Sequence, residues 1–417
     1  ESAVAQRVRR YKKAFHMNSV VRQMWEQNTD VVMVDTGNSY EGLCEYVGGK
    51  YISYTDEHPI TMNPFAIKRE ELNIEKIGFL KNLVMLIWKG TQGEVTKTED
   101  RLIEQVITEY FDEYFMKKQI ENLSFNTFYE YSTVRIPQII KENNLAGIDL
   151  ASYNYLLKDF YKGGSHELTL NENLDTKLFD ETFIVFEIDS IKDDPLLFPL
   201  VTLIIMDVFI QKMRIKKNRK VLVIEEAWKA IASPMMAEYI KYLYKTARKF
   251  WASVGVVTQE IQDIVGSPIV KEAIINNSDV VMLLDQSKFR ERFDEIKAIL
   301  GLTDVDCKKI FTINRLENKE GRSFFREVFI RRGSVGGVFG VEEPHECYMT
   351  YTTERAEKEA LKLYKKELQC DHQHAIEAYC RDWELSGITK SLPFAQKVNQ
   401  TGHVLNLKPK RKFDEYM

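Results

Sequence analysis

The chain of 417 residues is 44% hydrophobic and 29% charged, with 20 glycines and 10 prolines. This globular composition excludes extended disorder, and the length allows two or three packed subdomains. A formal net charge of −4 excludes a protein that holds nucleic acid through its overall charge. The five cysteines are scattered and odd in number (Cys44, Cys307, Cys347, Cys370 and Cys380), which favours reduced thiols in a cytosolic compartment.

The N-terminal region alternates between helix and strand signals. Its first 14 residues are polar and basic, a composition from which we expect no signal peptide. Residues 15–21 predict the start of a helix, and residues 31–34 predict a strand that ends in Asp35. A turn, a helix over residues 40–46 and a strand over residues 51–54 follow. This alternation favours a nucleotide-binding α/β unit.

A phosphate-binding loop is expected directly before the first of these helices. In nucleotide-binding βαβ units this loop has the pattern G-x-x-x-x-G-K-[ST]. Counting back from Phe15 puts Lys13 at the lysine and Ala14 at the Ser/Thr position, whereas Arg7 and Lys12 stand where the two glycines belong. Only the lysine of the motif is therefore present.

The missing residues carry most of the chemistry of such a loop. Glycines let backbone N–H groups wrap a phosphate, and the hydroxyl group binds Mg²⁺. We therefore expect weak Mg-ATP binding from this chain. Two alternatives stay open: Lys12 and Lys13 are ordinary surface charges, or the first 14 residues are not the native lead-in to Phe15.

Residues 69–165 change to unbroken helical periodicity. Apolar residues recur at helical spacing, and a polar break over residues 90–100 separates two helices. This pattern predicts an all-helical insertion. Its many aromatic residues are expected in the core rather than around a cofactor.

The α/β pattern returns over residues 183–189. An apolar run over residues 195–210 follows, but it contains Pro199 and Asp207 and is too short to span a bilayer. It predicts a buried helix, so any membrane attachment is expected to come through partners. The basic cluster at residues 212–220 has two interpretations: a face for DNA or a protein partner, or a solvated helix end stabilised by the helix dipole.

Two further strands end in polar residues that suit catalysis. Residues 221–224 form an apolar strand followed by Glu225 and Glu226, and a strand at residues 252–257 is followed by Thr258 and Gln259. Parallel strands place such residues together in a crevice at their carboxyl ends. The alternative is that the two glutamates cap the next helix.

The remaining residues predict a further strand at 280–284, helices at 289–300 and 353–383, and a hairpin around residues 321–330. Cys370, His372, His374 and Cys380 match no closed zinc pattern, because His-x-His on a helix points the two rings apart. We therefore expect no metal there. A basic tail over residues 408–412 ends the chain.

The ordered series Val-Asp-x-Gly-x-x-Tyr, Gly-Gly-x-Tyr, Asn-Pro-Phe, Glu-Glu-Ala-Trp and Thr-Gln resembles the ATPases of conjugation and type IV secretion machines. These belong to the HerA/FtsK superfamily of P-loop motors, and the resemblance covers residues 15 to about 340. It implies an α/β, RecA-like P-loop fold with a mostly parallel sheet and an all-helical insertion subdomain. The expected division is a P-loop domain over residues 1–68 and 176–350, the insertion over 69–175, and a C-terminal helix and tail over 351–417. We expect residues 15–65 and 180–340 to share one sheet, with the helical residues as a separate lobe.

The resemblance also implies roles for particular residues, with ATP and Mg²⁺ as cofactors. Lys13, with Ala14 and Phe15 beside it, would contact the phosphates, and Glu225 would bind the Mg²⁺ shell. Glu226 would activate water, close to Lys13, and Gln259 would sense the γ-phosphate. Arg248 and Arg322 are the candidates for an arginine that reaches the γ-phosphate of a neighbouring subunit, with a plain salt bridge as the alternative for each.

The implied partners are other secretion-system subunits and inner-membrane components, with the chain cytoplasmic and peripheral at the inner membrane. A homo-hexamer and contact with DNA are left open. Two rival functions also remain: a HerA/FtsK-type DNA translocase, and a nucleotide-dead structural subunit of the same machine.

Overall fold

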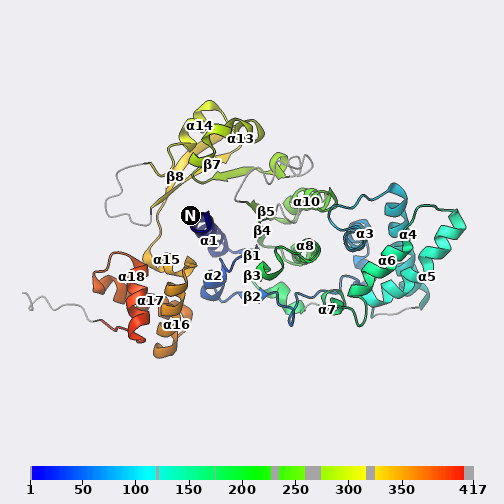
Figure 1. Ribbon diagram of the computed structural model, residues 1–417, viewed down its shortest axis with the longest axis horizontal. Coiled ribbons are helices and arrows are strands. Elements are labelled where there is room, and N and C mark those ends of the chain that lie inside the picture. The colour runs from blue at the N-terminus through cyan, green and yellow to red at the C-terminus, as the bar shows by residue number, and fades with distance from the viewer. Residues whose placement is uncertain are drawn as a thin grey trace, which may run out of the picture. The chain divides into compact units, whose positions relative to one another are not determined.

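The computed structural model describes residues 2–118, 122–173, 175–226, 234–258, 274–315 and 325–407 (Figure 1). The chain forms two compact units. One, the sheet unit, comprises residues 28–37 and 52–277; the other, the C-terminal unit, comprises residues 1–27, 38–51 and 278–417.

A five-stranded sheet has the order β2-β3-β1-β4-β5, and all of its strands except the first residues of β2 belong to the sheet unit. The bounds are β1 Thr29–Asp35, β2 Lys50–Ser53, β3 Phe183–Glu187, β4 Arg219–Glu225 and β5 Ala252–Val257. β1 pairs in parallel with β3 and β4, and β4 pairs in parallel with β5. The side chains of β1 and β3 are buried throughout, as expected for strands covered on both faces of a parallel sheet. The prediction of an α/β fold with a mostly parallel sheet is confirmed.

The helices of the sheet unit follow the predicted periodicity. They are η1 Arg69–Glu71, α3 Ile74–Lys89, α4 Lys97–Phe111, the π-helix η2 Asp112–Lys118, α5 Phe125–Asn143, α6 Leu150–Leu157, η3 Lys158–Phe160, α7 Glu167–Asn171, η4 Thr176–Asp180, η5 Asp189–Ile191, α8 Leu197–Ile215, α10 Pro234–Ala247, η6 Arg248–Phe250 and η7 Ile275–Asn277. No strand lies between β2 and β3 in the described part of the chain. The predicted helical character of this segment is therefore confirmed.

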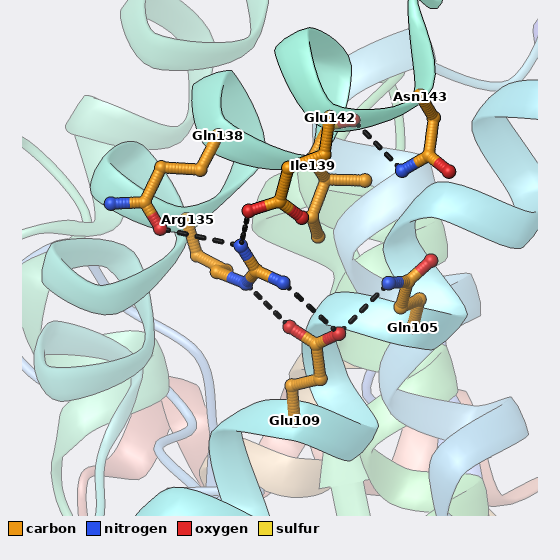
Figure 2. A network of polar contacts seen from close by, with 7 residues as sticks. All are labelled: Gln105, Glu109, Arg135, Gln138, Ile139, Glu142 and Asn143. Carbon is orange, nitrogen blue, oxygen red and sulfur yellow. Dashed lines mark hydrogen bonds and ion pairs between the residues drawn. The ribbon is translucent and has the colours of Figure 1, made fainter.

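Local signals explain where the helices of this segment begin and how they are joined. Thr96 and Glu99 form a capping box at the start of α4, and Gly90, at φ 67°, ends α3. Arg135 of α5 donates to Glu109 of α4 and to Glu142, which ties the two helices together on the surface (Figure 2). The helices also share one continuous hydrophobic core with the strands β1, β3 and β4.

Helix α8 contains the apolar run, and nearly all of its side chains are buried. Its burial confirms the prediction of a core helix. Across the described ranges, no helix has the length and apolar character that a membrane crossing requires.

The C-terminal unit contains a second, antiparallel sheet in the order β6-β7-β8. Its elements are α1 Ser2–Glu26, α2 Glu41–Tyr46, β6 Val280–Leu283, η8 Ser287–Arg292, α13 Phe293–Leu300, α14 Asp304–Ile310, β7 Arg326–Arg332, β8 Val335–Val341, α15 His345–Tyr351, α16 Arg355–Leu368, α17 His372–Ser386 and α18 Ser391–Thr401. The prediction that residues 180–340 join one sheet is wrong for these three strands. β7 and β8 form a hairpin that turns at Gly333, at φ 58°. Residues 321–324 of the predicted hairpin lie outside the described residues.

The expected helix over residues 353–383 is also divided in two. Gln369, at φ 48°, ends α16 in the left-handed conformation, and Asp371 caps α17. The two helices pack with α18 around a core that includes Tyr364, Tyr379 and Trp383. This arrangement buries apolar faces that one long helix would have left exposed.

Candidate functional site: the carboxyl edge of the parallel sheet

Three strands of the parallel sheet end in an acidic residue at the same edge. Asp35 ends β1, Glu187 ends β3 and Glu225 ends β4, and all three are buried. Asp35 lies opposite Glu187 in the register, and Val34 lies opposite Ile224, so that Glu225 follows directly beside Asp35. Neighbouring strands are about 4.8 Å apart. The carboxyl edge therefore carries a row of three acidic residues across β3, β1 and β4.

Backbone groups fix the Glu187 carboxylate at one end of this row. Its Oε1 accepts from the Asp189 backbone N–H at 2.8 Å, and its Oε2 accepts from the Gly37 N–H at 3.4 Å. The Ile188 N–H donates to the Asp35 carbonyl at 2.9 Å, which ties the β3 turn to the end of β1. Glu187 is thus anchored by two turns of the edge.

Glu226 follows Glu225 in a left-handed conformation, with φ 51°. Its backbone N–H donates to the Val257 carbonyl of β5 at 3.0 Å. A non-glycine residue at such an angle is strained, and strain of this kind occurs most often at functional sites. Residues 227–233 lie outside the described part, so the helix-capping interpretation stays open.

The donor set fits a hard divalent cation. Adjacent buried carboxylates repel each other unless a cation compensates them. Mg²⁺ is commonly held by one or two carboxylates together with substrate phosphates, rather than by a cage of protein ligands. The described residues contain no group of three or more His, Cys, Asp and Glu side chains placed to hold a metal on their own.

The cysteine and histidine residues of α17 have other contacts. His374 Nδ1 lies 2.8 Å from Asp371 Oδ1, and His372 Nδ1 lies 3.3 Å from Glu45 Oε2. Burial lowers the pKa of His372 below its ordinary value of 6.5, although Glu45 opposes that shift. Cys380 is buried in the core of the C-terminal helices.

The expected phosphate loop is a helix in this structure. α1 runs without interruption from Ser2 to Glu26, so the prediction that a helix begins at Phe15 is wrong. Residues 2–14 contain neither glycine nor proline and are rich in good helix formers, so nothing in them stops the helix. The interior N–H groups of an α-helix bond to carbonyls four residues earlier, and therefore none is available to cradle a phosphate.

The residues of the expected loop have structural contacts in α1. Ala14 is 1% exposed and Phe15 is 9% exposed; the Phe15 ring lies 5.4 Å from that of Tyr351. Asn18 Nδ2 donates to the carbonyls of Ala14, at 2.9 Å, and Ser39, at 3.0 Å. The side chain of Lys13 is outside the described part, so its phosphate contact and its expected proximity to Glu226 remain predictions.

The other predicted site residues are divided between the described and the masked parts of the chain. Gln259 and Arg322 lie outside the described residues. Arg248 begins η6, just before β5, and is therefore at the amino-terminal edge of the sheet. A strand of six residues is about 20 Å long, so Arg248 lies about that far from the carboxylates of its own copy.

Four of the six cations in the basic cluster over residues 212–220 have partners within the chain, and two of these four, Lys212 and Lys220, are buried. Lys212 is buried, with its Nζ 2.9 Å from Asp30 Oδ2, and Lys220 Nζ donates to the Phe250 carbonyl at 3.0 Å. Arg214 pairs with Glu75, and Lys216 pairs with Asp180. These four cations thus make contacts within the chain, and the choice between the two interpretations of the cluster stays open.

Comparison with known proteins decides the family. Residues 11–383 match the family described as the TraG P-loop domain. The chain belongs to this family. As a member of the TraG P-loop domain family, it is 22% identical over 295 residues to "Protein TraC" of Escherichia coli (strain K12). That match covers 66% of this chain and 31% of the relative, so the chain spans about a third of the curated relative's length.

Solved structures of low sequence identity share the fold of this TraG-family chain. VirB4 of Thermoanaerobacter pseudethanolicus aligns with a TM-score of 0.58 and 19% identity, over 80% of this chain and 87% of that one. The bacterial conjugative coupling protein TrwBdeltaN70 aligns with a TM-score of 0.51 and 12% identity, over 80% and 82%. TrwB in complex with ADP and Mg²⁺ aligns with a TM-score of 0.50 and 12% identity, over 79% and 81%.

Sequence reasoning assigned no role to Asp35 or Glu187, the two further carboxylates of the row. A signal for both is present: each follows a run of apolar β-formers, as Glu225 does. The run alone does not show that the three strands are neighbours, and only the pairing β3-β1-β4 brings the carboxylates together.

Proposed function

We propose that this chain is the motor domain of an ATPase in a conjugation or type IV secretion apparatus, which hydrolyses ATP to power assembly or substrate transfer. The observation that carries the proposal is the row of buried carboxylates at the carboxyl edge of a parallel sheet, in a member of the TraG P-loop domain family. The TrwB structures in complex with ADP and Mg²⁺ and with a non-hydrolysable ATP analogue support the choice of nucleotide and metal.

Within this proposal, the two glutamates after β4 have different roles. Glu225, buried beside Asp35, holds Mg²⁺, which neutralises charge on the phosphates when bound. Glu226 is fixed by its N–H bond to β5 and accepts the proton of the attacking water. Gln259 senses the γ-phosphate, and Lys13 contacts the phosphates when the preceding residues form a loop.

Arg248 acts between copies in this proposal. Because it lies about one strand length, about 20 Å, from its own carboxylates, it contacts the γ-phosphate held by a neighbouring subunit. Such an arrangement needs a homo-oligomer, for which we propose a hexamer. Arg322 is the second candidate for this role.

The continuous helix α1 favours a second candidate function: a nucleotide-dead structural subunit of the same machine. A chain without the phosphate loop keeps its surfaces for assembly but loses most contacts to ATP. A HerA/FtsK-type DNA translocase is the third alternative, and binding of DNA that weakens steeply with salt would support it.

The remaining features of the proposal concern place and organisation. The partners are other secretion-system subunits and inner-membrane components, at the cytoplasmic face of that membrane. Residues 69–175 act as the helical insertion of a P-loop domain formed by residues 1–68 and 176–350, with residues 351–417 as a C-terminal addition.

ATPase measurements on a chain with a rebuilt loop test the proposal. The substitutions Arg7→Gly, Lys12→Gly and Ala14→Ser restore the missing residues and remove good helix formers from α1. We expect Mg²⁺-dependent ATP hydrolysis in this variant, and a loss of about a hundredfold or more when Glu226→Gln is added. Glu172→Gln, an exposed acid of the same unit, is the matched control and should not change the rate. A folded rebuilt chain without hydrolysis would instead support the structural subunit.

A further inference from the structure

Strand β8 lies at one edge of the antiparallel sheet, where it pairs with β7 (Figure 1). Its sequence, Val-Gly-Gly-Val-Phe-Gly-Val, contains neither a charged residue nor a proline. Soluble proteins usually place charges, prolines or bulges on such edges, because these features prevent pairing with another strand. Val335 is 75% exposed and Phe339 is 53% exposed. β8 is therefore an exposed, apolar edge that lacks the usual protection within its own sequence.

The turn between β7 and β8 determines which backbone groups of β8 point away from β7. Gly333, at φ 58°, and Ser334 form a two-residue turn that the pair Arg332 and Val335 closes. The closing pair of such a hairpin is hydrogen-bonded, and hydrogen-bonded pairs recur at every second residue from there. The residues of β8 whose N–H and C=O groups point outward are therefore Gly336, Val338 and Gly340.

The hydrogen bonds of the structure agree with this assignment. The Gly336 carbonyl accepts from Lys309 Nζ at 2.8 Å, which requires that it point away from β7. The other outward groups of β8 have no hydrogen-bond partner among the described residues. A carbonyl oxygen has two lone pairs, so that Gly336 can accept a second hydrogen bond. A row of N–H and C=O groups along an edge is complementary to a further strand.

We propose that β8 pairs antiparallel with β8 of a second copy, which joins the two antiparallel sheets into one. The outward residues are spaced symmetrically about Val338. Pairing centred on Val338 places Gly336 opposite Gly340 of the second copy, and the two Val338 residues opposite each other. Every outward backbone group then has a partner. This inference does not rest on the proposed function.

The side chains fit the same register. Gly337 lies opposite Phe339 of the second copy, and an aromatic ring across from a glycine covers the backbone that the glycine leaves exposed. The two Phe339 rings are diagonal neighbours, which aromatic side chains can bridge. Phe339 also shares its face of the sheet with the exposed residues Val280 and Met282 of β6. Pairing thus extends an apolar face across both copies.

Charge favours the antiparallel orientation. Arg332 is exposed beside the start of β8, and Glu342 is exposed directly after its end. Antiparallel pairing brings the start of one β8 beside the end of the other, so the arginine of one copy and the glutamate of the other lie at the same end of the pair. Parallel pairing would bring like charges together, which is unfavourable.

A second copy is therefore complementary to β8 in backbone groups, side-chain volume and charge. An extended segment of an unrelated protein would satisfy the backbone groups, but it would not need their symmetry about Val338. The proposed contact uses the same residues on both copies, so it joins copies in pairs. A ring of copies needs a head-to-tail contact instead, and the two contacts are independent.

A disulfide at the two-fold axis tests the register in the full chain. Directly opposite residues of a hydrogen-bonded pair have Cα atoms about 5.5 Å apart, which is within the range of a disulfide. Val338→Cys should therefore give a covalent dimer as the main product of mild oxidation. Val280→Cys is the matched control, because Val280 is 44% exposed on β6, at the opposite edge of the same sheet. It should give no more dimer than the wild-type chain.

The substitution Phe339→Lys tests the strength of the contact by sedimentation velocity over a range of concentrations without nucleotide. It places two like charges near the two-fold axis, so the dissociation constant of the dimer should rise about tenfold or more. The thermal midpoint should stay close to that of the wild type, because Phe339 is half exposed. Val280→Lys is the control on the same face and should leave the dissociation constant unchanged.

Three results would overturn the proposal. The wild-type chain could stay monomeric up to about 100 μM, which would leave β8 to a segment of another protein. Self-association could persist unweakened in Phe339→Lys, which would place the contact between copies elsewhere. Finally, Val338→Cys could give no more covalent dimer than Val280→Cys.

Discussion

A buried ion pair between α3 and α8 gives a direct test of how the helical segment is joined to the sheet. Lys76 Nζ lies 2.8 Å from Asp207 Oδ2, and the two side chains are 8% and 5% exposed. Gln211 Nε2 also donates to Asp207 Oδ2 at 2.7 Å, and Lys76 Nζ lies 4.6 Å from the centre of the Phe79 ring. Both charges are thus removed from water and depend on each other.

The substitution Asp207→Ala leaves the Lys76 ammonium buried without its partner. We expect the free energy of unfolding to fall by about 3–5 kcal/mol. The reason is that the buried ammonium group would have neither a counter-charge nor water around it, which costs more than the lost hydrogen bond alone. Urea unfolding followed by circular dichroism measures this change. Since the helices and the sheet share one core, the transition of the sheet unit should remain single.

The double variant Lys76→Met and Asp207→Leu is the control, because it removes both charges and keeps most of the volume. It should be within about 1–2 kcal/mol of the wild type, or more stable. A loss below about 1 kcal/mol in Asp207→Ala would show that the pair is hydrated, and would refute the reasoning. Separate transitions for the helical segment and the sheet would refute the shared core.

Two further predictions concern pH and the surface of the helical segment. Burial lowers the pKa of His372 and of His16 below 6.5, so the unfolded chain binds more protons and the stability of the C-terminal unit should fall as pH drops below about 6.5. His372→Gln should flatten this dependence in thermal unfolding at several pH values; an unchanged slope would contradict it. Arg135→Ala breaks the partly exposed network of Figure 2 and should cost about 1 kcal/mol or less, with a smaller effect at high salt. A cost that salt does not reduce would contradict that electrostatic account.

The strands of the parallel sheet could be predicted in large part from local sequence. Residues 31–34 and 221–224, for example, are apolar and rich in β-branched residues, and an acidic residue follows each run. The pattern therefore predicts both the strand and the acidic residue at its carboxyl end. The helices within residues 69–165 could be predicted for the same reason, because the helical spacing of their apolar residues is a local pattern.

Two features could not be read in this way. The phosphate-loop motif predicts a loop before Phe15, whereas the helix-forming residues 2–14 extend α1 through that position. The antiparallel sheet was missed because β6 is as apolar as the parallel strands, and its pairing with β7 joins residues more than 40 positions apart. Such pairing depends on the whole fold, and a local pattern does not contain it.

The central claim is that the carboxyl edge of the parallel sheet binds Mg-nucleotide once a phosphate loop replaces the start of α1. Calorimetric titration with Mg-ATP tests it in three chains: the wild type, the rebuilt chain with Arg7→Gly, Lys12→Gly and Ala14→Ser, and the rebuilt chain with Glu225→Gln.

Two charge-assisted hydrogen bonds lost at about 3 kcal/mol each shift a micromolar dissociation constant to the order of tens of millimolar. We therefore predict no detectable binding by the wild type, binding by the rebuilt chain, and a marked loss with Glu225→Gln. Micromolar binding by the wild type that disappears on Lys13→Ala would contradict the account of α1. Tight binding by the rebuilt chain that Glu225→Gln leaves unchanged would contradict the site itself.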